Sequence, residues 1–215
     1  MKICGTDEAG RGPLIGPMVM CGVMVDDSKE KQFVELGVKD SKLLTPEQRE
    51  RMFEKIKEIA DDFEIIILTP ADIDDALNSP DLNLNWLEAE ATAKILDKLK
   101  ADKAFIDCPS NNVSAYKEYL ANKMKTKTEL VVEHKADVNY PVAAAASILA
   151  KVTRDREIVK LKKEYGEVGS GYPADPITQE FLKQNWNRHP KIFRRTWASY
   201  KKIVKEQGQK GLNEF

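Results

Sequence analysis

The sequence predicts an α/β fold with a mixed five-stranded sheet, flanked by helices and followed by a C-terminal helical extension. Three observations lead to this prediction. Short β-branched and apolar runs alternate with longer segments in which apolar residues recur at helical spacing. A Gly- and Pro-rich link joins the first two runs, as in a hairpin-like connection. The last part of the chain, beyond residue 166, carries helical patterns without strands.

Five runs rich in apolar and β-branched residues are the expected strands. They span residues 1–6, 18–25, 63–68, 103–108 and 129–134. Turn-forming residues follow several of them, most clearly the run Pro109, Ser110, Asn111, Asn112 after the fourth.

The helices are predicted from apolar periodicity and from end signals. Thr45, Pro46 and Gln48 form a clear start, because the threonine can cap, the proline suits the first helical position and the glutamine completes a capping box. An alanine run after Pro141 predicts a helix that approaches the sheet closely. The expected helices cover residues 45–60, 70–77, 85–99, 116–124, 141–165, 178–188 and 196–206.

Length and composition fit one large domain, or one domain with a small appendage. The chain has 215 residues, 42% of them apolar, and no run approaches the ~20 apolar residues of a membrane span. We expect no membrane association and no signal peptide. Cys4, Cys21 and Cys108 show no Cys-x-x-Cys spacing, so we expect reduced thiols in a cytoplasmic protein. We also expect a monomer. Cys108 is expected to pack as a small apolar side chain rather than act as a nucleophile.

Charge is unevenly distributed, although the net charge is only −1. Residues 141–215 carry 15 basic and 8 acidic residues, and residues 1–140 carry 19 and 27. A basic C-terminal third suits contact with a phosphate backbone. The alternative is a set of ordinary amphipathic helices with solvated lysines, and charge alone favours that alternative.

Two adjacent acids, Asp7 and Glu8, end the first expected strand and precede the turn Gly10-Arg11-Gly12. Adjacent carboxylates repel each other, so a cation is the expected neighbour. The glycines allow the backbone to come close to a ligand, because they carry no Cβ. The motif indicates metal-dependent phosphate chemistry, and the alternative is a solvated turn with charged residues.

Two further acids stand in similar settings. Asp107 ends the fourth expected strand, and Asp137 follows the fifth. Ligand sites in open α/β sheets lie at the carboxyl ends of strands, so the four acids are expected to converge. Oxygen ligands without a Cys or His cluster suit Mg²⁺ or Mn²⁺ rather than zinc.

At these motifs the chain resembles the ribonuclease HII family, the type 2 ribonucleases H, in its archaeal form. Five segments match in the family's order: residues 7–17, 39–42, 107–112, 133–155 and 169–173. The first and fourth are long and specific. The resemblance implies a ribonuclease H-like fold and a site made of the carboxylates Asp7, Glu8, Asp107 and Asp137. It also implies a catalytic domain at 1–165, a substrate-binding extension at 166–207 and a tail at 208–215.

The implied reaction is hydrolysis of the RNA strand of RNA/DNA hybrids, and cutting 5′ to ribonucleotides embedded in duplex DNA. The products carry a 3′-OH and a 5′-phosphate. Two divalent ions ~4 Å apart would activate water and stabilise the leaving oxygen. His134 is expected to be a packed, hydrogen-bonded residue rather than a catalytic one.

The resemblance also implies substrate contacts. Backbone groups of Gly10, Arg11 and Gly12 read the 2′-OH that distinguishes RNA from DNA. Tyr172, between Gly171 and Pro173, resembles the family tyrosine that stacks on the sugar at the RNA–DNA junction.

Other residues resemble contacts to the nucleic-acid backbone. Phosphate contacts are expected at Lys42, Ser147 and Lys151, and contacts from the C-terminal helices at Arg194, Arg195 and Trp197.

Two alternatives to this function belong to different classes. A related ribonuclease H-like DNA nuclease, such as a resolvase, shares the acids but lacks the 2′-OH reader. A non-catalytic nucleic-acid-binding module would bind hybrid without cutting it and would tolerate loss of the acids.

The tail resembles the peptide motif that binds replication sliding clamps. Gln209, Leu212 and Phe215 have the motif's spacing, but the second aromatic is absent. Leu212 and Phe215 would enter an apolar pocket from one helical turn. Gly208 and Gly211 argue against a stable free helix, and the alternative is a frayed terminus.

Overall fold

The computed structural model describes the backbone of residues 1–38 and 44–212, and side chains as far as Gln207. These residues form two compact units. Unit 1 comprises Met1–Ala9, Val19–Ile67 and Asn83–Thr153, and unit 2 comprises Gly10–Met18, Leu68–Leu82 and Arg154–Phe215. The candidate catalytic acids belong to unit 1, and the glycine-rich turn belongs to unit 2.

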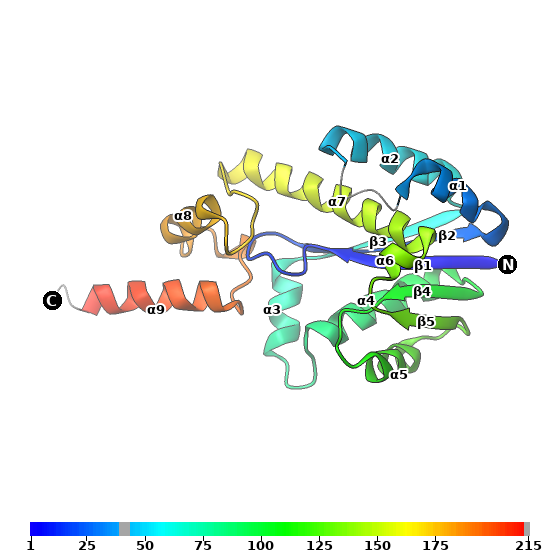
Figure 1. Cartoon of the computed structure of the whole chain (residues 1–215). Helices are drawn as coiled ribbons and strands as arrows, with labels where there is room; N and C mark the ends of the chain where they lie inside the picture. The colour runs from blue at the N-terminus through cyan, green and yellow to red at the C-terminus, as the bar shows by residue number, and fades with distance from the viewer. Residues whose placement is uncertain (39–43, 213–215) are drawn as a thin grey trace. The chain divides into compact units, whose positions relative to one another are not determined.

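A five-stranded mixed sheet with the order β3-β2-β1-β4-β5 forms the centre of unit 1, which confirms the predicted fold class (Figure 1). Strand β1 pairs antiparallel with β2 and parallel with β4, and β4 pairs parallel with β5. The strands are β1 (Lys2–Ala9), β2 (Met18–Asp26), β3 (Asp62–Leu68), β4 (Lys103–Asp107) and β5 (Glu129–Glu133).

Helices cover both faces of this sheet. Figure 1 shows α1, α2 and the first part of α7 on one side, and α4 and α5 on the other. Two glycines show how closely the layers approach. A Cβ on Gly5 would lie 2.2 Å from the backbone nitrogen of Ala143 in α7, and one on Gly22 would lie 2.3 Å from Ile95 in α4. The helices are α1 (Glu30–Leu36), α2 (Pro46–Ile59), α4 (Leu84–Leu99), α5 (Val113–Lys123) and α7 (Pro141–Tyr165).

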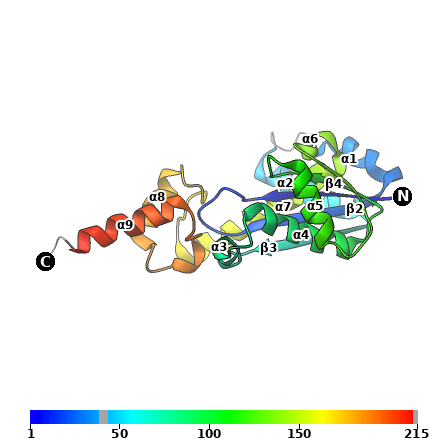
Figure 2. The same cartoon turned by 90° about the horizontal axis from the view of Figure 1, so that it is seen from below.

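Unit 2 is built around the segment Gly10–Met18. The backbone N–H of Arg194 donates to the carbonyl of Leu14 (2.9 Å), and that of Gly16 donates to Ile192 (2.9 Å). Apolar side chains of residues 10–18 and of residues 190–194 share a core with α8 and α9. Helices α8 and α9 contact each other and lie near each other in Figure 2. The elements here are α3 (Pro70–Asn78), the end of α7, α8 (Pro176–Asn185), η3 (Pro190–Ile192) and α9 (Ala198–Leu212).

The structure extends or adds several elements relative to the prediction. Strand β1 continues to Ala9 because Ala9 still pairs with Val19 of β2. Helix α8 begins at Pro176, capped by Asp175. Helix α9 has helical backbone to Leu212, beyond the predicted end at residue 206. Elements absent from the prediction are η1 (Asp27–Lys29), α1, α6 (Ala136–Asn139) and η3.

Other expectations are confirmed. The capping box of α2 is present, with the hydroxyl of Thr45 accepting from the N–H of Gln48 and the Gln48 side chain accepting from the N–H of Thr45. Helix α7 has the predicted bounds. Within the described part of the chain, no helix is long and apolar enough to cross a membrane.

Candidate active site

Asp7 and Glu8 lie inside β1, near its C-terminal end, and point to opposite faces of the sheet because strand residues alternate. Asp7 is on the face covered by α7 and is only 6% exposed. Glu8 is on the face of α4 and α5, where burial, the charge of Glu88 and then the charge of Glu8 raise the pKa of Tyr116. The carboxylates of these two adjacent acids therefore lie on opposite faces of the sheet near the end of β1.

Asp107 ends β4 beside Asp7. The register pairs Thr6 with Ile106, so the next residues, Asp7 and Asp107, are neighbours on one face. Burial raises the pKa of Asp107, a hydrogen bond from the N–H of Ala136 (3.1 Å) lowers it, and the charge of Asp137 raises it. Asp137 stands in the first turn of α6 rather than at the end of a strand, yet its charge acts on Asp107. The structure thus places Asp107 beside Asp7 and within the electrostatic influence of Asp137.

Ser147 and Lys151 complete the surroundings of Asp7. Burial raises the pKa of Asp7 to about 6, the Ser147 hydrogen bond and the Lys151 charge oppose this, and the charge of Asp107 adds to it. The Lys151 ammonium donates to the Ser147 oxygen one helical turn earlier, so the Ser147 hydroxyl proton is directed to Asp7. Ser147 is 1% exposed. In the structure the Ser147 hydroxyl hydrogen-bonds Asp7. A contact between Ser147 and a phosphate stays a prediction.

The chemistry of these acids fits a hard divalent cation. Buried carboxylates that raise one another's pKa are stabilised by a cation, and oxygen donors suit Mg²⁺ or Mn²⁺. Among the residues described by the structure, no three acid, His or Cys side chains are arranged to hold one ion together. The carboxyl of Asp7 accepts from the N–H of Glu8 (2.8 Å), and Glu8 lies on the other face.

In the turn Gly10-Arg11-Gly12, neighbouring atoms leave no room for a side chain at Gly10, whereas Gly12 has room for one. Gly10 has φ +80°, and a Cβ there would lie 2.0 Å from Nε of Arg154. A Cβ on Gly12 would meet only the Tyr172 ring, at 3.7 Å, which is ordinary contact. The fold of unit 2 therefore requires glycine at position 10 but not at position 12.

Tyr172 lies beside this turn with 48% of its surface exposed. The guanidinium of Arg154 is 5.9 Å from the centre of its ring. Arg154 is buried and donates to the carbonyl of Ile15 (3.2 Å), and burial lowers its pKa. An exposed aromatic face supported by a buried cation suits stacking on a ligand.

A comparison with known families identifies the chain. Residues 4–200 match the family model described as Ribonuclease HII.

The chain belongs to the ribonuclease HII family.

Similar proteins agree over the full length. The ribonuclease HII of Thermococcus sibiricus is 46% identical, with 100% of this chain and 98% of that protein covered. The crystal structure of ribonuclease H2 from Pyrococcus horikoshii OT3 matches with a TM-score of 0.89 and 42% identity, covering 96% of this chain and 98% of that one. The PCNA:RNase HII complex from Archaeoglobus fulgidus matches with a TM-score of 0.84 and 40% identity, covering 92% and 95%. This ribonuclease HII chain is an endoribonuclease with the ribonuclease H fold.

Sequence reasoning assigned Arg194 to the duplex, and the structure corrects this. Arg194 is fully buried and donates to backbone carbonyls of residues 10–16. Arg195 is exposed, but its N–H and Nε donate to the buried carboxylate of Asp74 (2.9 and 3.4 Å). The indole of Trp197 donates to the carbonyl of Gly12 (3.1 Å). No sequence signal distinguished the buried arginine from its exposed neighbour.

Cys108 and His134 have the surroundings of packed residues, as the sequence predicted. Cys108 is a buried free thiol, and burial raises its pKa. Nδ1 of His134 lies 3.0 Å from the carbonyl oxygen of Cys108, which can only accept. Cys4 and Cys21 are also buried and free.

Several predicted contacts lie outside the described residues. Lys42 and the rest of the matching segment 39–42 are among them, as is Phe215. Gln209 and Leu212 belong to the helical backbone of α9, but their side chains are not described.

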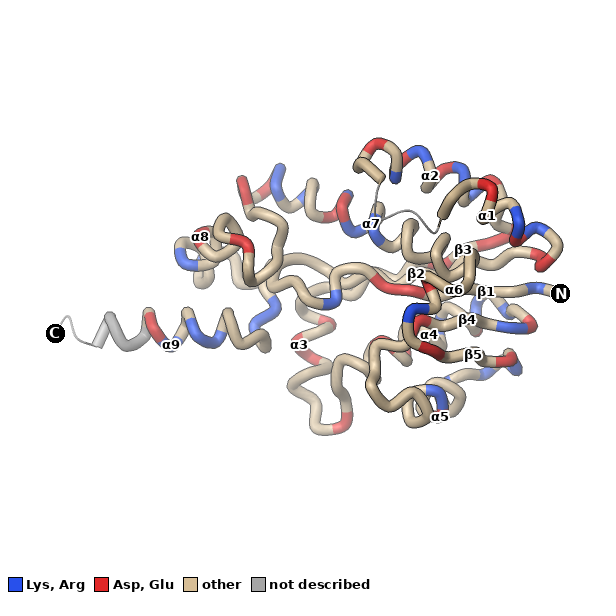
Figure 3. Tube along the Cα trace, viewed as in Figure 1, with Lys and Arg blue, Asp and Glu red and all other residues tan. Residues whose placement is uncertain are grey.

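Basic and acidic residues alternate in the described part of the C-terminal third. Figure 3 shows Lys and Arg along α7 and α9 with acidic residues among them. Several of these lysines pair with a nearby glutamate: Lys160 with Glu157, Lys162 with Glu167, Lys183 with Glu180 and Lys202 with Glu206. This supports ordinary amphipathic helices over a dedicated charged face.

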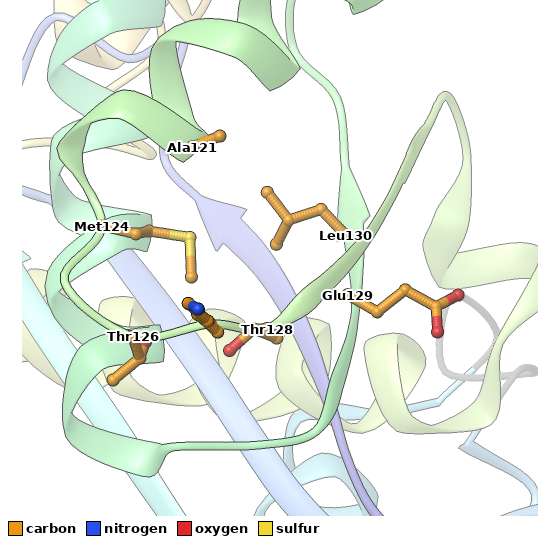
Figure 4. Close-up of a pocket in the computed structure, with 7 residues that line it drawn as sticks. Ala121, Met124, Thr126, Thr128, Glu129 and Leu130 are labelled. Carbon is orange, nitrogen blue, oxygen red and sulfur yellow. The ribbon is translucent and has the colours of Figure 1, made fainter.

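A shallow pocket of about 360 Å³ lies in unit 1 away from the acids (Figure 4). It is lined by the end of α5 and the start of β5, whereas Asp107 stands at the opposite, C-terminal end of the neighbouring strand. Its lining residues are Ala121, Met124, Thr126, Lys127, Thr128, Glu129 and Leu130.

The loop that presents Tyr172 should loosen in acid. Hydrogen bonds from the N–H and hydroxyl of Ser170 (2.6 and 2.7 Å), and from the N–H of Ile177 (3.0 Å), lower the pKa of Asp175 to about 2. A carboxyl whose pKa is lower in the folded than in the unfolded state stabilises the fold above about pH 3.9 and loses this effect as the pH falls toward 2. We expect Asp175→Asn to be less stable than the native chain at pH 6, and the difference to vanish near pH 2. Urea unfolding of both chains between pH 6 and pH 2 measures the difference in their free energies of unfolding. A difference that does not change with pH would contradict a stabilising role for the Asp175 carboxylate.

Proposed function

We propose that the chain is a divalent-metal-dependent endoribonuclease acting on the RNA strand of RNA/DNA hybrids and on ribonucleotides embedded in duplex DNA. It cuts 5′ to the ribonucleotide and leaves a 3′-OH and a 5′-phosphate. The observation that carries the proposal is the continuity of the motif: Asp7 and Glu8 lie in the last residues of β1, and the Gly10-Arg11-Gly12 turn follows directly after Ala9. Residues 1–165 supply the catalytic groups, and residues 166–207 extend substrate binding.

The metal would be held by Asp7, Glu8, Asp107 and Asp137. Divalent ions bound there supply Lewis acidity for the attacking water and for the leaving 3′ oxygen. The chain's own residues position the carboxylates: Ser147 and the N–H of Glu8 orient Asp7, and the N–H of Ala136 orients Asp107. Glu8 would contribute its carboxylate from the other face of the strand end.

Recognition of the ribose is assigned to the turn and to Tyr172. Backbone N–H groups of the turn donate to the 2′ oxygen, and the Tyr172 ring stacks on the sugar. The open space beside Gly12, bordered by the Tyr172 ring, supports this assignment. Lys42, Ser147 and Lys151 are proposed to contact phosphates.

A substrate panel tests the proposal against its two rivals. The full chain with Mg²⁺ is given an RNA/DNA hybrid, an all-DNA duplex and a four-way DNA junction. We expect cleavage of the hybrid alone. Cleavage of the junction would favour a DNA resolvase, and binding of hybrid without cleavage would favour a binding module.

Loss of the Tyr172 ring should weaken cleavage at isolated ribonucleotides. A stacking contact contributes about 1–3 kcal/mol, so Tyr172→Ala should reduce kcat/KM roughly 10- to 100-fold. Tyr172→Phe retains the ring and serves as the matched control, with activity close to native. Steady-state cleavage of a duplex with one ribonucleotide measures both. A loss in Tyr172→Ala that is accompanied by an equal loss of metal affinity would indicate a folding role instead.

The tail is proposed to bind the replication sliding clamp. The Archaeoglobus fulgidus relative was solved in complex with PCNA at 40% identity, and Gln209, Leu212 and Phe215 carry the motif spacing here. Binding of the clamp would bring the enzyme to newly replicated DNA.

Calorimetric titration of the cognate clamp tests this tail. We expect the full chain to bind and a chain ending at Gly208 to lose binding. Lys210→Ala with Asn213→Ala is the matched control, because it alters the tail outside the motif and should bind normally. Equal affinity of the full and shortened chains would refute the proposal, and cleavage of short duplexes without clamp should be the same for all.

A further inference from the structure

Two side chains of the C-terminal segment occupy the carbonyl groups of the Gly10-Arg11-Gly12 turn. Arg194 donates from Nη2 to the carbonyl of Gly10 (2.5 Å) and from Nη1 to that of Arg11 (2.8 Å). Trp197 donates from Nε1 to the carbonyl of Gly12 (3.1 Å). Three successive carbonyls are therefore held by side chains from one short segment.

The Arg194 guanidinium is well suited to this position. Its Nε also donates to the carbonyl of Gly16 (3.1 Å), so one planar group spans both ends of the loop. The residue is fully buried, and its Cζ lies 4.9 Å from the centre of the Trp197 ring. A lysine could not donate to three carbonyls in fixed directions, because its ammonium is a single point on a flexible stem.

Fixed carbonyls determine where the peptide N–H groups point. Each peptide unit is planar and trans, so the N–H lies opposite the preceding C=O. With the carbonyls of Gly10 and Arg11 bound to Arg194, the N–H groups of Arg11 and Gly12 point away from Arg194. Gly12 also leaves room at its Cα, where an added Cβ would meet only Tyr172.

We infer that Arg194 is a positioning residue that sets the enzyme's preference for a ribonucleotide. It fixes the carbonyls of Gly10 and Arg11, and the opposite side of the turn presents the N–H groups of Arg11 and Gly12 to an acceptor, the 2′ oxygen of ribose. Trp197 holds the carbonyl of Gly12, whose peptide unit ends at Pro13 and carries no N–H, so this bond fixes no donor. The inference rests on the proposed function and adds the residue that determines its specificity.

Arg194→Lys is the most selective test. It keeps the buried positive charge, but its ammonium cannot hold the carbonyls of Gly10 and Arg11 in fixed directions. Two quantities are measured with Mg²⁺ on the full chain: KM for a duplex with one ribonucleotide, and the inhibition constant of the same duplex made only of DNA. One hydrogen bond is worth about 0.5–1.5 kcal/mol, so we expect KM to rise about three- to tenfold while the all-DNA constant and kcat stay near native.

Arg188→Lys is the matched control, since it makes the same change at an exposed position of unit 2. It should leave the ratio of the two constants unchanged. A native ratio in Arg194→Lys, or an equal change in both variants, would overturn the inference. If Arg194→Lys does not fold, Arg194→Gln, whose amide can still donate to a carbonyl, decides by the same ratio. A native chain that shows no preference for the ribonucleotide would instead refute the proposed function itself.

Discussion

Replacement of Asp7 or Asp107 by asparagine is expected to abolish cleavage while leaving the fold intact. Each change removes one negative charge from the proposed metal site, which should cost several kcal/mol of transition-state stabilisation, or on the order of 10³-fold in rate. The fold should not suffer. Burial raises the pKa of Asp7 to about 6. At neutral pH the ionised carboxyl is therefore less favourable in the folded chain than in the unfolded chain, and it lowers the free energy of unfolding. Asparagine retains an oxygen that can accept from Ser147 and from the N–H of Glu8.

The measurement combines single-turnover cleavage with thermal unfolding at pH 7.5. Asp61→Asn provides a control of the same chemistry, since Asp61 pairs with Lys2 and Lys29 (2.7 Å each) away from the site. We expect Asp61→Asn to be active, and Asp7→Asn to be inactive and at least as stable as the native chain. Undiminished cleavage by Asp7→Asn or Asp107→Asn would remove the site assignment.

Alanine at Gly10 and alanine at Gly12 should have opposite consequences. At Gly10 the positive φ and the clash with Arg154 each cost about 1–3 kcal/mol, so Gly10→Ala should destabilise the chain by roughly 2–6 kcal/mol. At Gly12 a methyl group meets only ordinary contact, so Gly12→Ala should fold as well as the native chain. The added methyl group occupies the space beside Tyr172, so cleavage at a ribonucleotide should fall at least about tenfold.

Urea unfolding separates the two variants, and kcat/KM at pH 7.5 measures the functional effect. Gly12→Ala with native stability and reduced activity would show that this glycine serves the substrate rather than the fold. A Gly12→Ala enzyme with native activity would contradict the assignment of this space to the ribose. Gly10→Ala with native stability would contradict the described packing of Arg154.

The fold was predictable because its signals are local. The Thr45 capping box, the alanine-rich helix starting at Pro141 and the strand-length apolar runs each specify an element through neighbouring residues. The elements that were missed lack such signals. Helix α6 has four residues and begins after Lys135, which has a positive φ of 61°. The end of β1 depended on pairing with Val19, a partner that is distant in sequence.

The sequence predicted which acids stand near one another better than it predicted their arrangement, and their catalytic role stays a prediction. The motifs predicted that Asp7, Glu8, Asp107 and Asp137 converge, and the structure places Asp107 beside Asp7 and near the charge of Asp137. That Glu8 lies on the opposite face follows from the continuation of β1 through the motif. The roles of Ser147 beside Asp7 and of buried Arg194 depend on contacts between segments far apart in the chain, on which a single sequence carries no information.

Cleavage of a DNA duplex that contains one ribonucleotide tests the central claim most directly. The strand with the ribonucleotide is labelled at each end in turn, treated with the full chain and Mg²⁺, and its products are mapped and their ends identified. The account predicts a single cut 5′ to the ribonucleotide, with a 3′-OH and a 5′-phosphate, and no cut in the matched all-DNA duplex. Equal cleavage of the all-DNA duplex, or binding of the ribonucleotide duplex without cleavage, would contradict it.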